Sequence, residues 1–307
     1  MKFVTFVKQN DRERAGLLVD DDHVVDLHEA SDGILPDNLL DFLDNSVENL
    51  EIAAGLLSIS TEHTGVYRLN ELILKAPLPS PRSFRDFYAF EEHVKTARTN
   101  RGLAMIPEWY EKPVFYFSNH LAFRGPDEEI EKPIECEWLD YELEIACIIG
   151  KKGRNIHVEE ANDFIFGYCI LNDWSARDIQ RKEMKVGLGP AKGKDFATSI
   201  GPWIVTKDEL ERLKVGKGFD LSMKARVNGV LLSEGNMKDI YYSFAEMIER
   251  ASLGVTLYPG EIIGSGTIGT GCILELGPDI HRWLQPADRV ELEIEKLGIL
   301  TNRIVWK

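Results

Sequence analysis

The chain has 307 residues, of which 44% are hydrophobic and 28% charged, and its formal net charge is −15. This length can bury a large core, and the composition is that of an ordinary globular protein. The negative charge argues against nucleic acid or an anionic membrane as a partner, because phosphate groups would be repelled. A small acidic substrate stays compatible with it, since local cations or a metal ion can reverse the field inside a pocket.

The cysteines and the N-terminal sequence predict a soluble cytoplasmic protein. Cys136, Cys147, Cys169 and Cys272 show no CxxC spacing and lie in or beside apolar stretches. This pattern is typical of buried reduced thiols and not of a disulfide framework or a zinc site. Residues 1–14 lack the apolar segment of a signal peptide, and no apolar run is long enough to span a membrane.

The first part of the chain is predicted to form a small N-terminal accessory β domain over residues 1–78. Strands are expected over residues 3–7, 15–19 and 23–27, and one or two helices within 39–57. The segment LKAPLPSPRSFRDF that follows holds three prolines, which lack an amide donor and favour extended backbone before them. We therefore place a linker here, with the boundary between residues 78 and 79.

Residues 79–307 are expected to form a β-rich α+β domain. Short apolar runs separated by glycine and proline predict strands, whereas helical spacing is confined to residues 90–101, 176–185 and 242–252. Asn228 and Gly229 predict a hairpin, because both accept the positive φ angles of a type I′ turn.

Two glutamates in the segment YELEIACIIG are the first candidates for chemistry. Glu142 and Glu144 are two residues apart, so on a strand they share a face, and we expect Asp140 on the same face. Adjacent like charges on a half-buried strand destabilise it unless a cation lies between them. Oxygen ligands alone favour Mg²⁺, Mn²⁺ or Ca²⁺ over zinc. The alternative is an ordinary solvated polar face.

Two further candidates lie elsewhere in the chain. Asp173 closes an apolar strand and directly precedes a helical stretch, a position where catalytic groups are often mounted. The alternative is that Asp173 or Ser175 caps that helix. His93 follows the segment RDFYAFEE and can act as a general base near neutral pH, although a lone histidine is more often structural.

Taken together, these segments resemble the fumarylacetoacetate hydrolase family. The resemblance covers roughly residues 80–307 and follows the family's linear order. It rests on the segments DFYAFEEH, YELEIACIIG, LNDWSARDIQ, GKDFATSIGPW and GTIGTGCILEL. It implies a mixed β-roll for the second domain, a homodimer, and one bound Mg²⁺, with Mn²⁺ or Ca²⁺ as alternatives.

The resemblance also assigns roles to individual side chains. The implied metal ligands are Asp86, Glu142, Glu144 and Asp173. The implied general base is His93, with its imidazole oriented by Glu275. The groups implied to hold the substrate and stabilise the developing anion are Arg177, Gln180 and Lys194. Less specific substrate contacts are implied for Tyr88, Arg101, Tyr116 and Thr267. The five-residue spacing from Tyr88 to His93 resembles that of the fumarylacetoacetase branch, and this resemblance implies a distant glutamate partner instead of Glu91 or Glu92.

The implied activity is hydrolysis of a carbon–carbon bond in a small 1,3-diketo acid of the acylpyruvate or fumarylacetoacetate type. The metal ion would stabilise the enolate that leaves, and Arg177 and Lys194 would supply positive charge where negative charge develops.

Other activities fit the same residues. They are decarboxylation, isomerisation, or hydration and dehydration, of a 2-oxo acid or a 2-keto-3-deoxy sugar acid. A module that only binds a ligand, or carboxylates that are merely surface and capping residues, are the remaining alternatives.

Overall fold

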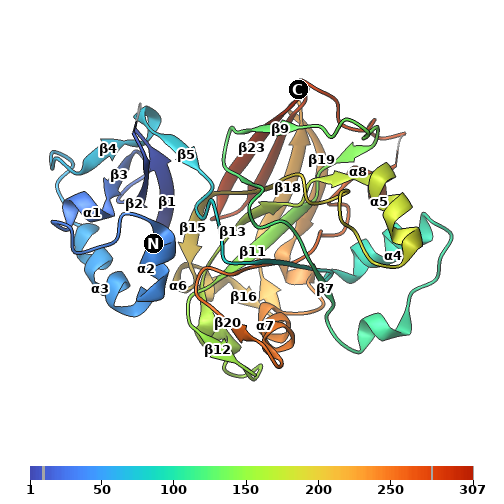
Figure 1. The fold of residues 1–307 in the computed structure, drawn as a ribbon, viewed down its shortest axis with the longest axis horizontal. Coiled ribbons are helices and arrows are strands. Elements are labelled where there is room, and N and C mark those ends of the chain that lie inside the picture. The colour runs from blue at the N-terminus through green and yellow to red at the C-terminus, as the bar shows by residue number, and fades with distance from the viewer. Residues whose placement is uncertain (9–10, 278, 307) are drawn as a thin grey trace.

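The computed structural model describes residues 1–8, 11–277 and 279–306, and sheet dominates it (Figure 1). Twelve strands of the described residues form one sheet in the order β4-β3-β2-β1-β15-β13-β11-β21-β6-β7, with β5 beside β1 and β8 beside β15. Its N-terminal strands are β1 (Lys2–Val7), β2 (Glu13–Leu18), β3 (His23–Asp26), β4 (Val66–Arg68) and β5 (Ile73–Lys75). The others are β6 (Phe84–Phe87), β7 (Phe115–Phe117), β8 (Phe123–Arg124), β11 (Leu143–Ile149), β13 (Ile165–Asn172), β15 (Thr198–Thr206) and β21 (Ile262–Gly264).

A second sheet packs on one face of the first. Its order within the described part of the chain is β19-β18-β22-β23-β9. The strands are β9 (Glu129–Glu131), β18 (Ser222–Val227), β19 (Val230–Asn236), β22 (Arg289–Ile294) and β23 (Gly298–Val305). Ile145 of β11 shares one core with Leu292 of β22, whereas Ala146 faces a second core beneath the N-terminal segment. Because β11 is buried on both faces, it reads as a continuous apolar run after Glu144.

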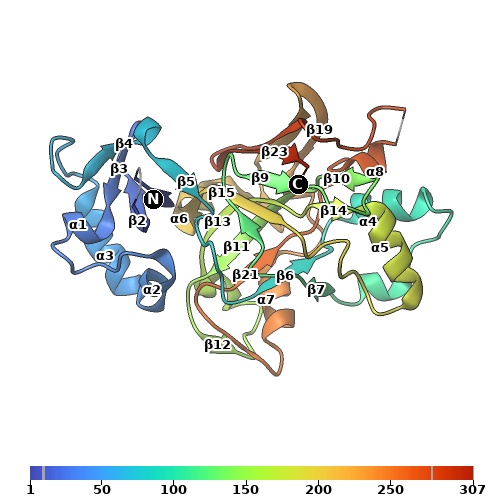
Figure 2. The same cartoon turned by 45° about the horizontal axis from the view of Figure 1, so that its top comes forward.

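The helices are short. They are α1 (Leu27–Ala30), α2 (Leu39–Asp44), α3 (Ser46–Leu56), α4 (Glu91–Thr99), α5 (Arg177–Glu183), α6 (Lys207–Leu210), α7 (Phe244–Ser252) and α8 (Ile273–Leu276). Helix α2 covers one face of the large sheet, where its Phe42 packs on Phe3 and Phe166. Two-stranded pairs join β10 (Leu139–Asp140) to β14 (Ser175–Ala176), β12 (Gly153–Arg154) to β20 (Thr256–Leu257), and β16 (Lys214–Val215) to β17 (Gly218–Phe219). In both ribbon views α4, α5 and α8 gather on the side opposite the N-terminal segment (Figures 1 and 2).

The predicted fold class is confirmed, because the structure is mixed α+β with mostly sheet. The hairpin at residues 227–230 is also confirmed. Asn228 and Gly229 have φ angles of 51° and 81°, and they join β18 to β19. In the described ranges, none of the helices has the length and apolar character needed to cross a bilayer.

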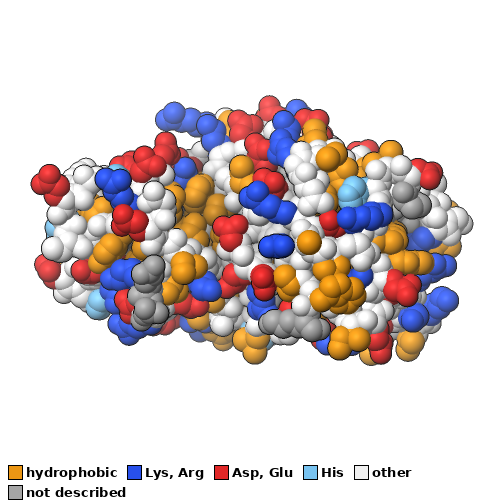
Figure 3. All heavy atoms as spheres, turned by 90° about the horizontal axis from the view of Figure 1, so that it is seen from above, with side chains coloured by type: hydrophobic (Ala, Val, Ile, Leu, Met, Phe, Trp, Pro, Cys, Tyr) orange, Lys and Arg blue, Asp and Glu red, His pale blue; other side chains and the backbone are white. Residues whose placement is uncertain are grey.

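Charged side chains of both signs are interspersed over the face of the molecule shown in Figure 3. The acidic excess of the composition is therefore mixed with lysine and arginine on this face. Such a mixed surface is typical of globular proteins.

The N-terminal segment shares both hydrogen bonds and core with the rest of the chain. Strand β1 pairs with β15, with Lys2 opposite Val205 and Phe3 opposite Ile204. Phe166 of β13 packs against Phe3, with ring centroids 5.4 Å apart. The boundary at residues 78 and 79 stays a prediction, but the contacts favour cooperative unfolding of both parts.

Replacing Phe166 with alanine tests this cooperativity. We expect a loss of about 3–5 kcal/mol in unfolding free energy, because a large buried ring leaves a cavity. Urea unfolding followed by circular dichroism and tryptophan fluorescence should give coincident transitions in the wild-type protein and the variant. The control Ile134→Ala removes a side chain that is 89% exposed and should change stability by less than about 0.5 kcal/mol. Separate transitions for the two probes would contradict the shared core.

Candidate functional site

Four carboxylates converge at one end of the central strands. Asp86 lies on β6, Glu144 on β11, Glu142 just before β11, and Asp173 just after β13. Each offers an oxygen within 4.8 Å of an oxygen from the others, and all four side chains are buried. The sheet order explains the convergence, because β13, β11, β21 and β6 are consecutive neighbours.

A glycine-rich strand end makes room for these carboxylates. A Cβ atom on Gly264 would lie 2.4 Å from Oδ1 of Asp86. The Gly266 amide donates to Oδ1 of Asp86 at 3.3 Å and to Oε2 of Glu144 at 3.1 Å. Gly264 and Gly266 therefore line the carboxylate cluster with backbone.

Two buried cations form ion pairs with two of these carboxylates. Lys194 Nζ lies 2.5 Å from Oε2 of Glu142 and 2.6 Å from Oδ2 of Asp173. Arg177 donates from Nη2 to Oε1 of Glu142 at 2.8 Å. Both cations follow Asp173 in the chain, Arg177 at the start of α5 and Lys194 in the segment before β15.

The cations compensate only part of the negative charge. Burial raises the pKa of Asp86 and Glu144 well above the usual range, and neighbouring carboxylates raise it further. Burial also opposes the charge on Glu142, but Lys194 and Arg177 outweigh it and hold the pKa of Glu142 below its usual value. Asp86 and Glu144 therefore lack a positive partner of comparable strength.

A hard divalent cation would supply the positive charge that Asp86 and Glu144 lack. In the described part of the chain, Oδ1 of Asp173 is buried with no hydrogen-bond partner, although a buried carboxylate oxygen ordinarily has one. The donor set consists of carboxylate oxygens alone, which suits Mg²⁺, Mn²⁺ or Ca²⁺. Asp86, Glu142, Glu144 and Asp173 are thus the residues that would hold the ion.

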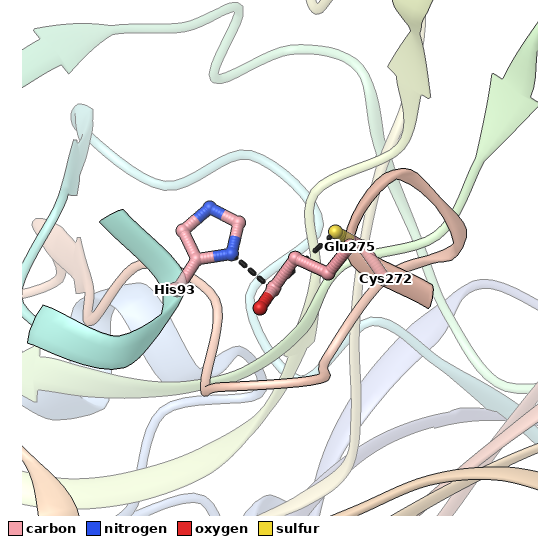
Figure 4. Close-up of side chains that lie close together, drawn as sticks. All are labelled: His93, Cys272 and Glu275. Carbon is pink, nitrogen blue, oxygen red and sulfur yellow. Dashed lines mark hydrogen bonds and ion pairs between the residues drawn. The ribbon is translucent and has the colours of Figure 1, made fainter. Parts of the chain in front are cut away.

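A histidine–glutamate dyad lies beside the carboxylate cluster. Nδ1 of His93, on α4, is hydrogen-bonded to Oε1 of Glu275, on α8, and the second ring nitrogen points away from that glutamate (Figure 4). The other carboxylate oxygen of Glu275 accepts the Thr270 amide at 2.9 Å. In its protonated form, His93 would lower the pKa of Glu142, so the dyad and the cluster are electrostatically coupled.

This pairing agrees with the predicted distant partner. Glu91 instead pairs with Lys95 at 2.8 Å, one helical turn further along α4. His93 and Glu275 are 182 residues apart in the chain, so local spacing alone carries no signal for their contact.

The remaining predicted residues lie around the carboxylate cluster and the dyad, except that Arg101 lies at the periphery. Tyr116 donates its hydroxyl to Asp173, and Thr267 Oγ1 lies 3.2 Å from Oε1 of Glu144. Gln180 Oε1 accepts from Nη1 of Arg177 at 3.2 Å.

On the dyad side, Tyr88 lies edge-on to the His93 ring, with centroids 5.3 Å apart. Burial raises the pKa of Tyr88 to about 12, so its hydroxyl keeps its proton. Arg101 is exposed and donates Nε to the Ala97 carbonyl at 2.8 Å, but its charge acts on Tyr88.

Asp140 lies on the same face as Glu142 and Glu144, as expected. The pairs Asp140–Ser175 and Leu143–Asn172 keep one register, and Tyr141 and Leu143 both contribute to the core on the other face. Asp140 is nevertheless outside the cluster of four carboxylates. One oxygen of Asp140 accepts Nε of Arg177 at 2.9 Å. The same carboxylate accepts the amides of Ile273 and Leu274 at 2.8 and 3.0 Å. Asp140 therefore links the cation Arg177 to the helix that carries the dyad glutamate.

The capping alternative for Asp173 and Ser175 is wrong. Ala176 occupies the N-cap position of α5, whereas Asp173 belongs to the carboxylate cluster. The hydroxyl of Ser175 donates to the Asp173 carbonyl at 3.0 Å.

Comparison with known proteins places the chain in a family. The family profile described as fumarylacetoacetate (FAA) hydrolase C-terminal matches residues 82–305, and the chain therefore belongs to the fumarylacetoacetate hydrolase family. Oxaloacetate tautomerase YisK of Bacillus subtilis is 32% identical, over 99% of this chain and 100% of its own length. Fumarylacetoacetase of Bos taurus is 31% identical over 63% of this chain and 58% of its own length. A solved fumarylacetoacetate hydrolase structure from Exiguobacterium antarcticum is 27% identical, covers both chains fully and gives a TM-score of 0.77.

Replacing Gly264 with alanine tests how closely the strand end is fitted to the carboxylates. The new methyl group would displace Asp86 from the cluster, so we expect a rise of about 10–100-fold in the dissociation constant of Mg²⁺, measured by calorimetric titration. The control Gly55→Ala lies in α3 with no atom within 4 Å of the new methyl group and should bind Mg²⁺ as the wild-type protein does. Equal affinity in Gly264→Ala would contradict the assigned cation position.

Proposed function

We propose that this protein is a metal-dependent tautomerase that interconverts the keto and enol forms of a small 2-oxo dicarboxylic acid such as oxaloacetate. The observation that carries the proposal is the buried pair of His93 and Glu275 beside four carboxylates suited to a hard cation. The full-length similarity to a protein named oxaloacetate tautomerase supports the choice of reaction. Mg²⁺ is the proposed ion, with Mn²⁺ and Ca²⁺ as alternatives.

The dyad supplies the base that this reaction needs. Because Glu275 accepts Nδ1–H of His93, we assign the neutral tautomer whose Nε2 is free to accept a proton. His93 takes a proton from the carbon beside the 2-oxo group. The electron pair of that C–H bond forms the C=C bond of the enol, while the π pair of the C=O bond moves onto its oxygen. The proton then goes to the former carbonyl oxygen, so atoms and charge balance. Glu275 stabilises the imidazolium that forms between these two transfers.

Positive charge near the substrate oxygens completes the site. The bound divalent cation would act as a Lewis acid toward the 2-oxo group. Lys194 and Arg177 hold Glu142 and Asp173 in place, and their positive charge offsets the ligands. Tyr88 keeps its hydroxyl proton and is available as a hydrogen-bond donor beside the His93 ring.

Hydrolysis of a carbon–carbon bond is the second candidate, and the same dyad supports it. His93 would then take a proton from water, whose oxygen adds to a carbonyl carbon of a 1,3-diketo acid. The carbon–carbon bond then breaks, and the leaving fragment takes the electron pair as an enolate. This enolate is then protonated. The two candidates differ in their products, since only hydrolysis consumes water and releases two acids.

The variant His93→Ala tests the role of the base. We expect kcat/KM for oxaloacetate tautomerisation to fall about 10²–10⁴-fold, because proton transfer by a positioned side chain contributes this much. The enol absorbance, corrected for the uncatalysed rate, measures the reaction. Mg²⁺ affinity should change little, since His93 is outside the four-carboxylate set. The control His157→Ala alters an exposed histidine and should keep full activity.

The same assay separates the two candidates. With Mg²⁺, wild-type protein should accelerate the loss of oxaloacetate enol without new acid products, and chelator should abolish the acceleration. Acylpyruvate cleavage, measured as pyruvate release, should stay at the uncatalysed rate. Pyruvate release without tautomerisation would replace the first proposal by the second.

A further inference from the structure

A second set of metal-ligating side chains lies outside the carboxylate cluster. His93 comes from α4, Glu275 from α8, and Cys272 from the residue just before α8 (Figure 4). Each offers a nitrogen, oxygen or sulfur atom within 4.8 Å of the others, and all three residues are buried. Cys272 Sγ lies 3.6 Å from Oε1 of Glu275, the same oxygen that is hydrogen-bonded to His93.

We propose that His93, Cys272 and Glu275 form an inhibitory site for a thiophilic divalent cation of the Zn²⁺ or Cd²⁺ class. Sulfur, imidazole nitrogen and carboxylate oxygen are the donors that zinc prefers, whereas the cluster of Asp86, Glu142, Glu144 and Asp173 offers oxygen only. Three protein ligands leave one tetrahedral position for water. The two sites therefore select different metals.

Charged groups lie around the Cys272 thiol. Besides burial, the carboxylates of Asp140, Glu275 and Glu142 raise its pKa, whereas the guanidinium of Arg177 lowers it. The thiol carries a proton in the metal-free protein, since burial raises the pKa of Cys272 well above its usual value. The incoming cation displaces this proton to solvent and replaces it with a metal–thiolate bond.

The site overlaps the base of the proposed reaction, and the predicted inhibition rests on that proposed function. Glu275 cannot both coordinate the cation and hold the imidazole for proton transfer. A coordinated His93 likewise has less capacity to accept a proton. Binding of the cation is a separate question, because it follows from the ligand geometry alone.

Cd²⁺ titration of the full-length, Mg²⁺-saturated protein tests the binding directly. The readout is the ultraviolet charge-transfer band of a thiolate–Cd²⁺ bond, which oxygen ligands do not produce. We expect the band in the wild-type protein, its loss in Cys272→Ser, and its retention in Cys136→Ser, a matched change of another buried cysteine. No band, or a band retained in Cys272→Ser, would overturn the proposal.

A second variant keeps the test valid if Cys272→Ser does not fold. His93→Ala leaves the thiol in place and should raise the Cd²⁺ dissociation constant at least about tenfold, because one of three ligands is lost. Unchanged Cd²⁺ affinity in this variant would contradict the proposed ligand set. Tautomerase activity is measured in the same titration. Cd²⁺ binding without inhibition would leave the metal site standing and argue against the dyad as the base.

Discussion

Burial of four carboxylates around one point is the constraint on which the rest of the site depends. Desolvation and mutual repulsion oppose the ionised form of Asp86 and Glu144 in particular. Lys194 and Arg177 lie toward Glu142 and Asp173, so they relieve only one side of the cluster. A dication between the four would supply the missing charge, and the partnerless Oδ1 of Asp173 is consistent with such a ligand.

The fold meets this constraint by bringing together strand ends that are distant in sequence. The neighbouring positions of β13, β11, β21 and β6 place the carboxylates side by side, and the glycines of the β21 segment give them room. Asp140 extends the arrangement from Arg177 to the backbone at the start of α8. The buried carboxylate of Asp140 therefore connects Arg177 to the helix that carries Glu275.

Local patterns in the sequence were sufficient for some of these features. The alternation of side chains along a strand placed Glu142 and Glu144 on one face. The Asn228-Gly229 pair predicted the hairpin between two strands. The contact between His93 and Glu275 required the family resemblance, because no local period links residues so far apart. The same alternation placed Asp140 on that face, but its pairing with Arg177 outside the cluster carries no local signal. The pairing of β1 with β15 was also beyond sequence reasoning, since non-local strand pairs leave no periodic signal.

The most direct test of the central claim is where a divalent ion binds. Mn²⁺ can replace Mg²⁺ in an all-oxygen site and scatters anomalously, so crystals grown with Mn²⁺ locate it unambiguously. We predict one strong anomalous peak within coordination distance of Asp86, Glu142, Glu144 and Asp173. A peak elsewhere, or a cluster that stays empty at saturating Mn²⁺, would contradict it.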